Sequence, residues 1–151
     1  MKRFLAAVVA VTTALALTAC GSSSTNTTTD DKSAESTDDT TYKIGVLQLT
    51  QHAALDKANE GFIAALDESG IKYEVDQQNA SGEQSACQTI AEKLVNDGND
   101  LIYAIATPAA QAVAGVTSEI PIVLSAVTDP AESGLVASND APGGNVTGTS
   151  D

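Results

Sequence analysis

The stretch DLIYAIATPAAQAVAG, residues 100–115, decides the fold. It opens with an apolar run from Leu101 to Ala106, of the kind that a strand buried on both faces of a parallel sheet requires. The run ends at Thr107-Pro108, and the alanines that follow predict a thin, closely packed helix with Pro108 in its first turn. Because N–H groups at a helix start attract anions, the sequence predicts a site for a negatively charged group there.

Outward from this stretch, strands and helices alternate along the chain. The expected strands are 43–49, 71–76, 101–106 and 121–127, and the expected helices are 53–69, 83–97 and 108–116. Short loops and right-handed crossovers then favour an α/β fold, a doubly wound parallel sheet with helices on both faces. The strand at 71–76 alternates apolar and polar residues, so we expect it nearer an edge of the sheet.

Two helices show an apolar face at helical spacing. For 53–69 the expected buried residues are Leu55, Ala58, Phe62, Ala65 and Leu66, and for 83–97 they are Cys87, Ile90, Ala91, Leu94 and Val95. Both sets fall on one side of their helix, which predicts packing against the sheet.

The first 41 residues differ from the rest. Residues 1–20 are typical of an export signal, with Lys2 and Arg3 before an apolar run of 14 residues and a cysteine at position 20. The sequence LTACG around Cys20 resembles the lipobox of bacterial lipoproteins, in which the cysteine is lipidated. Residues 21–41 are rich in Ser, Thr and Asp, which predicts a disordered polar tether. Residues 42–151 remain as one α/β domain of ordinary size.

Charge and motif content exclude several classes of function. Residues 42–151 hold 15 Asp and Glu against 4 Lys, a net charge of −11 that disfavours nucleic acid as a partner. A single histidine and scattered carboxylates give no metal-ligand spacing. The chain lacks a GxGxxG turn, a phosphate loop and a G-x-S-x-G elbow, so we expect neither a cofactor nor catalysis.

The loops after three strands are polar, and in a parallel sheet they meet at the ligand-binding edge. These loops are Thr50-Gln51-His52, Thr107-Pro108-Ala109 and Thr128-Asp129-Pro130. The N–H groups of Ala109 and Ala110, together with the Thr107 hydroxyl, could hold a carboxylate. The competing interpretation is that Thr107 is only the N-cap of its helix.

Other candidate residues carry the same ambiguity. Asp129 before Pro130 fits either a ligand ammonium group or an ordinary cap. His52 opens a helix and serves either as a helix-end residue or as a ligand contact, without partners for catalysis. Cys87 lies on an apolar helix face, which predicts a buried, unreactive thiol.

Four segments in this order carry a family resemblance. They are IGVLQLTQHAALDKANEGF, LIYAIATPAAQA, IPIVLSAVTDP and PGGNVTGTSD. Together they resemble the substrate-binding lipoproteins of ABC-type importers, in the group that includes binders of tryptophan and other aromatic amino acids. The resemblance covers nearly all of residues 42–151 and implies two similar α/β lobes of the type I periplasmic-binding-protein fold, with ligand trapped between them. Residues 42–151 would be the N-terminal lobe, ending where the chain crosses to the second.

The resemblance implies a set of ligand-binding residues in this lobe. They are Thr50, Gln51, Thr107, Pro108, Ala109, Thr128, Asp129 and Asp151. Thr107, Pro108 and Ala109 would hold the ligand carboxylate. Ser150 and Asp151 would lie at the crossing, with Asp151 a partner for a ligand amino group.

The expected function is therefore capture of a small carboxylate-bearing solute, such as an amino acid, and its delivery to an ABC permease. The expected location is the extracytoplasmic face of the cell membrane, with Cys20 as the lipid anchor. Two alternatives remain at this point, a ligand-sensing domain of a signalling system and an α/β enzyme that uses the same edge of the sheet. A second α/β lobe followed by the end of the protein would favour transport, and a transmembrane helix would favour sensing.

Overall fold

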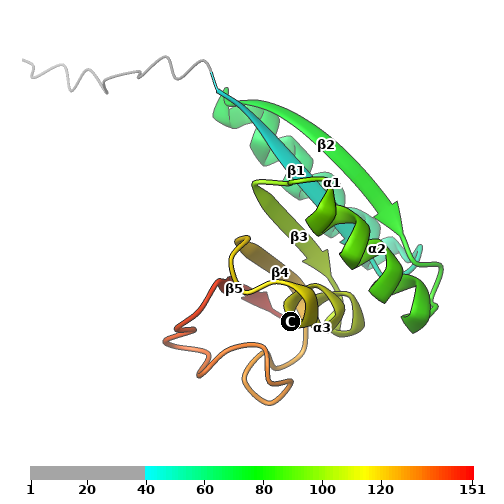
Figure 1. Ribbon diagram of the computed structural model, residues 1–151, viewed down its shortest axis with the longest axis vertical. Helices are drawn as coiled ribbons and strands as arrows, with labels where there is room; N and C mark the ends of the chain where they lie inside the picture. Colours follow the sequence, from blue (N-terminus) through cyan, green and yellow to red (C-terminus); the bar gives the residue numbers. More distant parts are fainter. Residues whose placement is uncertain (1–39) are drawn as a thin grey trace, which may run out of the picture. The chain divides into compact units, whose positions relative to one another are not determined.

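The apolar run of residues 101–106 forms the centre of a parallel sheet. The computed structural model describes residues 40–151, so the predicted export signal and all but the last two residues of the predicted tether lie outside them. Strand β3, Leu101–Ile105, lies third in the order β2-β1-β3-β4-β5, and every pairing is parallel (Figure 1). The predicted α/β fold with a doubly wound parallel sheet is confirmed.

The other elements follow the predicted order. The strands are β1 Thr41–Gln48, β2 Lys72–Asn79, β4 Ile122–Val127 and β5 Val146–Ser150, and the helices are α1 Ala53–Ser69, α2 Gln84–Asn96 and α3 Thr107–Val116. The predicted tether therefore ends one residue early, because Thr41 already belongs to β1. Strand β2 lies at an edge, as its alternating pattern predicts.

Helices cover both faces of the sheet. Helix α1 packs on one face against Val46, Tyr103 and Ile105, and the ring of its Phe62 stacks on Tyr103 with centroids 4.0 Å apart. Helices α2 and α3 pack on the other face, where Leu47, Ile102 and Leu124 are buried. Figure 1 shows α1 behind the sheet and the other two helices in front of it. Alternate residues of β1 and β3 therefore face opposite layers of the core.

The two amphipathic helices, α1 and α2, differ in how deeply their apolar faces are buried. In α2, Cys87, Ala91 and Leu94 are fully buried, so its predicted face is confirmed, and burial raises the pKa of the Cys87 thiol. In α1 no residue is fully buried, and Ala65 is exposed, so its inclusion in the buried face is wrong.

Strand β5 is the element that the sequence analysis missed. It pairs with β4 through Ile122–Val146 and Val123–Thr147, and a register shift follows between Leu124 and Val127. Within this irregularity Ala126 has a φ of 54° and Gly148 a φ of 148°. Only Val146 of the strand is buried, so the sequence of β5 has no apolar pattern that would predict a strand.

Candidate functional site

The carboxyl ends of all five strands meet at one edge of the sheet. The Leu49 amide donates to the Ile105 carbonyl at 3.2 Å, the Ala106 amide to Ser125 at 3.0 Å and the Asp151 amide to Val127 at 3.3 Å. These bonds align the loops after β1, β3, β4 and β5. The structure thus brings the predicted ligand residues to the same edge, and they are Thr50, Gln51, Thr107, Pro108, Ala109, Thr128, Asp129 and Asp151.

The start of α3 lies at the middle of this edge. Its N-cap is Ala106 and not Thr107, because Thr107 is already the first helical residue. No side chain caps the helix, so the interpretation of Thr107 as a simple N-cap is wrong. Ala106 has φ 82° and ψ 152°, a region that residues other than glycine rarely occupy and that costs about 1–3 kcal/mol. The short passage from β3 to α3 is therefore held under strain beside the site.

The first N–H groups of α3 point out of the helix toward the edge. An α-helix leaves its first N–H groups without intrahelical partners. Pro108, as a proline, has no backbone N–H group. The Ala110 amide donates to the Ala106 carbonyl at 3.0 Å, so its predicted role in carboxylate binding is wrong. Thr107 and Ala109 supply the N–H groups of this turn. Ala109 and Ala110 are fully buried, and their small side chains let α3 lie close to the sheet.

Asp129 at the end of β4 holds the segment that follows it. Its Oδ1 accepts hydrogen bonds from the Glu132 amide at 3.0 Å and from the Asn139 side chain at 3.1 Å. The Glu132 N–H, then the Asn139 amide, hold the pKa of Asp129 below its ordinary value. The capping interpretation of this aspartate therefore has a geometric basis, and contact with a ligand remains a prediction.

Replacement of Asp129 by Asn should reduce the acid sensitivity of the protein. A depressed folded pKa means that the carboxylate stabilises the fold fully above about pH 4 to 5, the range of an unfolded aspartate, and less as the pH falls through the lower folded value. Asp129→Asn cannot lose this contribution, so its urea midpoint should fall less between pH 6 and pH 3 than that of the unaltered protein. Asp140→Asn, an exposed carboxylate of the same segment, should keep the original difference. Equal pH dependence in both variants would contradict the prediction.

His52 and Cys87 occupy structural positions. His52 is the N-cap of α1, and its Nδ1 accepts from the Ala54 amide at 3.3 Å. Cys87 lies on the buried face of α2, as predicted, and in the opposite layer from α1. Cys87 and His52 do not form a Cys-His nucleophile, because Cys87 is buried in the layer of α2 and α3 whereas His52 caps α1.

Sequence reasoning missed the polar pair formed by Gln48 and Asp56. Gln48 ends β1 and is only 4% exposed, and its Nε2 donates to the Thr50 carbonyl at 2.8 Å and to Asp56 Oδ1 at 2.7 Å. The signal was present, because Gln48 is the one polar residue in the buried half of β1, two residues after Val46 and so on the same face of the sheet. The pair lies directly beside the predicted ligand loop.

Three hollows lie near the carboxyl edge. One of about 180 Å³ lies between α1 and the ends of β1 and β2, and its lining includes Gln48, Gln51 and Asp56. Another of about 350 Å³ lies between the first turns of α2 and α3 and is bounded by Gln84 and Pro108. Both are polar, and only the second reaches the lower range of small-molecule sites, which begins at about 300 Å³.

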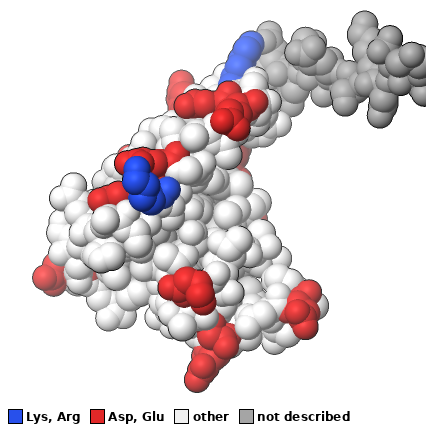
Figure 2. All heavy atoms as spheres, turned by 180° about the vertical axis from the view of Figure 1, so that it is seen from behind, with Lys and Arg blue, Asp and Glu red and all other residues white. Residues whose placement is uncertain are grey.

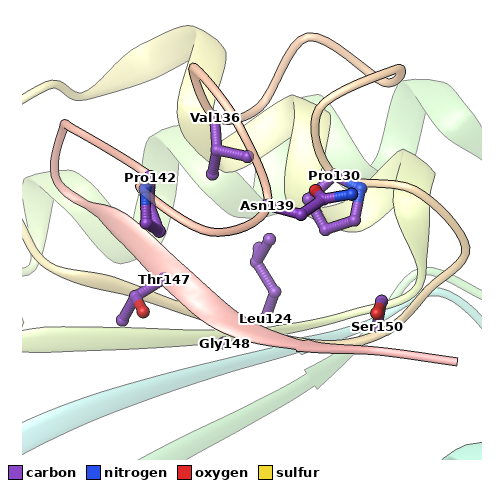
Figure 3. Close-up of a pocket in the computed structure, with 8 residues that line it drawn as sticks. All are labelled: Leu124, Pro130, Val136, Asn139, Pro142, Thr147, Gly148 and Ser150. Carbon is purple, nitrogen blue, oxygen red and sulfur yellow. The ribbon is translucent and has the colours of Figure 1, made fainter.

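The third hollow lies between the 130–142 segment and strands β4 and β5 and holds only about 50 Å³. Figure 3 shows Val136 and Pro142 of the segment after β4 projecting toward Leu124. This space is too small for an amino acid and belongs to the packing of the 130–142 segment against the sheet.

The described surface is strongly acidic. Figure 2 shows acidic side chains over several parts of one face, with few basic ones. Across residues 40–151, no group of three or more His, Cys, Asp or Glu is placed to hold a metal ion. Within the same residues, no helix is both long and apolar enough to cross a bilayer.

Comparison with known proteins gives a family match. Residues 43–151 match the model of a family described as ABC transporter substrate binding protein. A curated relative, the tyrosine-binding protein of Clostridioides difficile (strain R20291), is 52% identical in an alignment of 122 residues that covers 78% of this chain and 35% of that protein.

Two solved structures are also similar. An ABC domain from Streptococcus pneumoniae in complex with L-Trp is 44% identical with a TM-score of 0.72, over 74% of this chain and 39% of the other. A substrate binding protein with adhesive properties from Clostridium difficile, solved in a ligand-free, open form, is 46% identical with a TM-score of 0.71. The match covers 73% of this chain and 39% of the other. The chain thus spans between a third and two fifths of the length of the relatives that it matches.

Proposed function

Because the chain belongs to the family of ABC transporter substrate binding proteins, we propose that its described lobe binds the carboxylate end of an amino acid for import. The fold is that of the type I periplasmic binding proteins, of which the chain covers part of one lobe. The observation that carries the proposal is the uncapped start of α3 at the carboxyl edge of the sheet, with the N–H group and the hydroxyl of half-buried Thr107.

An aromatic amino acid is the proposed ligand. Two relatives with more than 40% identity support it, one named for tyrosine and one solved with L-Trp. In the proposed mechanism a second lobe closes over the ligand and buries the rest of its surface, and the loaded receptor delivers it to the permease. No bond is made or broken, so the protein acts as a receptor and not as an enzyme.

The carboxylate requirement is tested by calorimetric titration of the full-length protein. We expect tyrosine or tryptophan to bind and the corresponding carboxamide to bind far more weakly, because the amide loses the charge-assisted hydrogen bonds at the helix start. Equal binding of the acid and its amide would refute the carboxylate site. Absence of binding by any amino acid would refute the proposed ligand class.

Thr107→Val should weaken amino acid binding about tenfold or more. The substitution keeps the shape of the side chain but removes one hydroxyl donor to a charged group, a loss of about 1.5–3 kcal/mol. The dissociation constant measures the effect. Thr89→Val is the matched control, because Thr89 lies exposed on α2 and its hydroxyl donates only to the Ser85 carbonyl at 3.2 Å. Equal dissociation constants for the two variants would remove Thr107 from the site.

Export and lipid attachment are a second part of the proposal. The basic start, the apolar run of 14 residues and the LTACG sequence support lipidation of Cys20 on the extracytoplasmic face of the membrane. Residues 21–40 would then tether the lobe to the bilayer. Cys20→Ser should abolish incorporation of a labelled fatty acid and release the protein from the membrane fraction. Continued incorporation would refute the assignment.

A further inference from the structure

Gln48 is a buried polar side chain with both of its donor positions in use. A side-chain amide carries two N–H donors. Those of Gln48 go to the Thr50 carbonyl at 2.8 Å and to Asp56 Oδ1 at 2.7 Å. The first partner belongs to the loop after β1, and the second to the first turn of α1. One buried residue therefore connects the end of the strand, the loop and the helix.

The loop is fixed by backbone bonds on either side of Thr50. Before it, Leu49 donates to Ile105 at 3.2 Å and accepts from the Gly82 amide at 2.8 Å. After it, the His52 carbonyl accepts from the Asp56 amide at 2.8 Å. Between these anchors the carbonyl of the peptide after Thr50 accepts the hydrogen bond from Gln48. That peptide carries Thr50 and Gln51 at the ligand edge.

The neighbouring charge gives the pair its strength. Asp56 is half-buried, and a hydrogen bond to a carboxylate is shorter and about twice as strong as a neutral one. Asp56 also bonds through its own amide to His52, so the carboxylate is fixed relative to the helix start. The pair borders the hollow of about 180 Å³ at the edge of the sheet, within reach of an incoming solute.

We propose that Gln48 and Asp56 are positioning residues that hold the Thr50–Gln51 peptide in the conformation required for ligand capture. The inference rests on the proposed function for its effect on affinity. The order of the loop itself does not depend on any ligand. The two consequences can therefore be measured separately.

The variant Gln48→Met tests the proposal, because methionine keeps the length of the side chain and removes both donors. In the ligand-free full-length protein, hydrogen exchange at the Ala54 and Asp56 amides should accelerate about tenfold or more relative to the Ala104 amide of β3. The dissociation constant for tyrosine should rise by about tenfold or more. Asp56→Asn, which keeps the Oδ1 acceptor but loses the charge, should change both properties less than Asp56→Leu, and Asp56→Leu should reproduce Gln48→Met.

Asn99 supplies the matched control. It is the other buried polar residue among those described, 8% exposed, and its Nδ2 donates to the Leu94 carbonyl at 2.7 Å at the opposite edge of the sheet. Asn99→Leu should lower stability without changing relative loop exchange or affinity. Unchanged loop exchange in Gln48→Met, or an affinity loss equal to that of Asn99→Leu, would overturn the proposal. Failure of the unaltered protein to bind any amino acid would refute only the proposed function, because the exchange comparison still decides whether Gln48 orders the loop.

Discussion

Replacing Gly148 by Ala is expected to destabilise the protein by about 3 kcal/mol or more, at the upper end of overpacking substitutions. A Cβ at this position would lie 2.3 Å from the Leu124 carbonyl oxygen and 2.5 Å from the Leu124 nitrogen. Both atoms are backbone atoms of β4, so no side-chain rotation relieves the clash. The φ of 148° adds strain for any residue with a Cβ. The free energy of unfolding in urea measures the loss.

Gly144→Ala is the control for this prediction. Gly144 precedes the same strand, but a Cβ there would meet nothing within 4 Å. We expect its stability to stay within about 0.5 kcal/mol of the unaltered protein, as for other exposed substitutions. If Gly148→Ala proved as stable as Gly144→Ala, this result would contradict the close contact between Gly148 of β5 and the backbone of Leu124.

Leu94→Ala is expected to lower the free energy of unfolding by about 2–5 kcal/mol, the range measured when a leucine in a protein core is replaced by alanine. Leu94 is fully buried in α2, and its Cδ2 would lie 3.1 Å from a Cβ on Gly45, so the side chain packs directly on the backbone of β1. Few neighbours can move to fill the space, because the strand backbone forms one wall. Urea denaturation of the variant measures the difference.

Leu55→Ala provides the comparison for Leu94. Leu55 occupies α1, in which no residue is fully buried, and its side chain is only half-buried against the other face of the sheet. Because the Leu55 side chain buries less apolar surface on folding, we expect Leu55→Ala to lower the free energy of unfolding clearly less than Leu94→Ala does. Equal losses from both helices would contradict the difference in depth between the two layers.

The alternation of apolar runs and amphipathic helices was sufficient to predict most of the fold. The run from Leu101 is buried on both faces, and the α2 stripe is buried as its spacing indicates. Strand β5 escaped prediction because Gly148 and three hydroxyl side chains dominate its sequence, and its position depends on close contact with β4. Backbone pairing at such a strand leaves no periodic signal in the sequence.

The sequence was sufficient to predict that the candidate site lies at the carboxyl edge of the sheet, but it did not predict the hydrogen bonds within the site. The loops that carry Thr50, Thr107 and Asp129 meet where parallel strands require. That Ala106 and not Thr107 precedes α3 depends on a strained backbone, which local propensity does not indicate. The bond between Gln48 and Asp56 joins residues eight apart, and only the packing of α1 on β1 brings them together.

The interior position of β1, between β2 and β3, has a consequence for how the chain acquires its structure. This first strand pairs with β2 on one side and with β3 on the other, so its second neighbour appears only with residues 101–105. In a chain synthesised from its N-terminus, Ile44, Val46 and Leu47 stay partly uncovered until those residues emerge. Parallel pairing across such intervals slows folding, because loop closure precedes the contacts that reward it. The lobe should therefore collapse late and cooperatively, and a chaperone that holds the growing chain would meet β1 as its first apolar segment beyond residue 40.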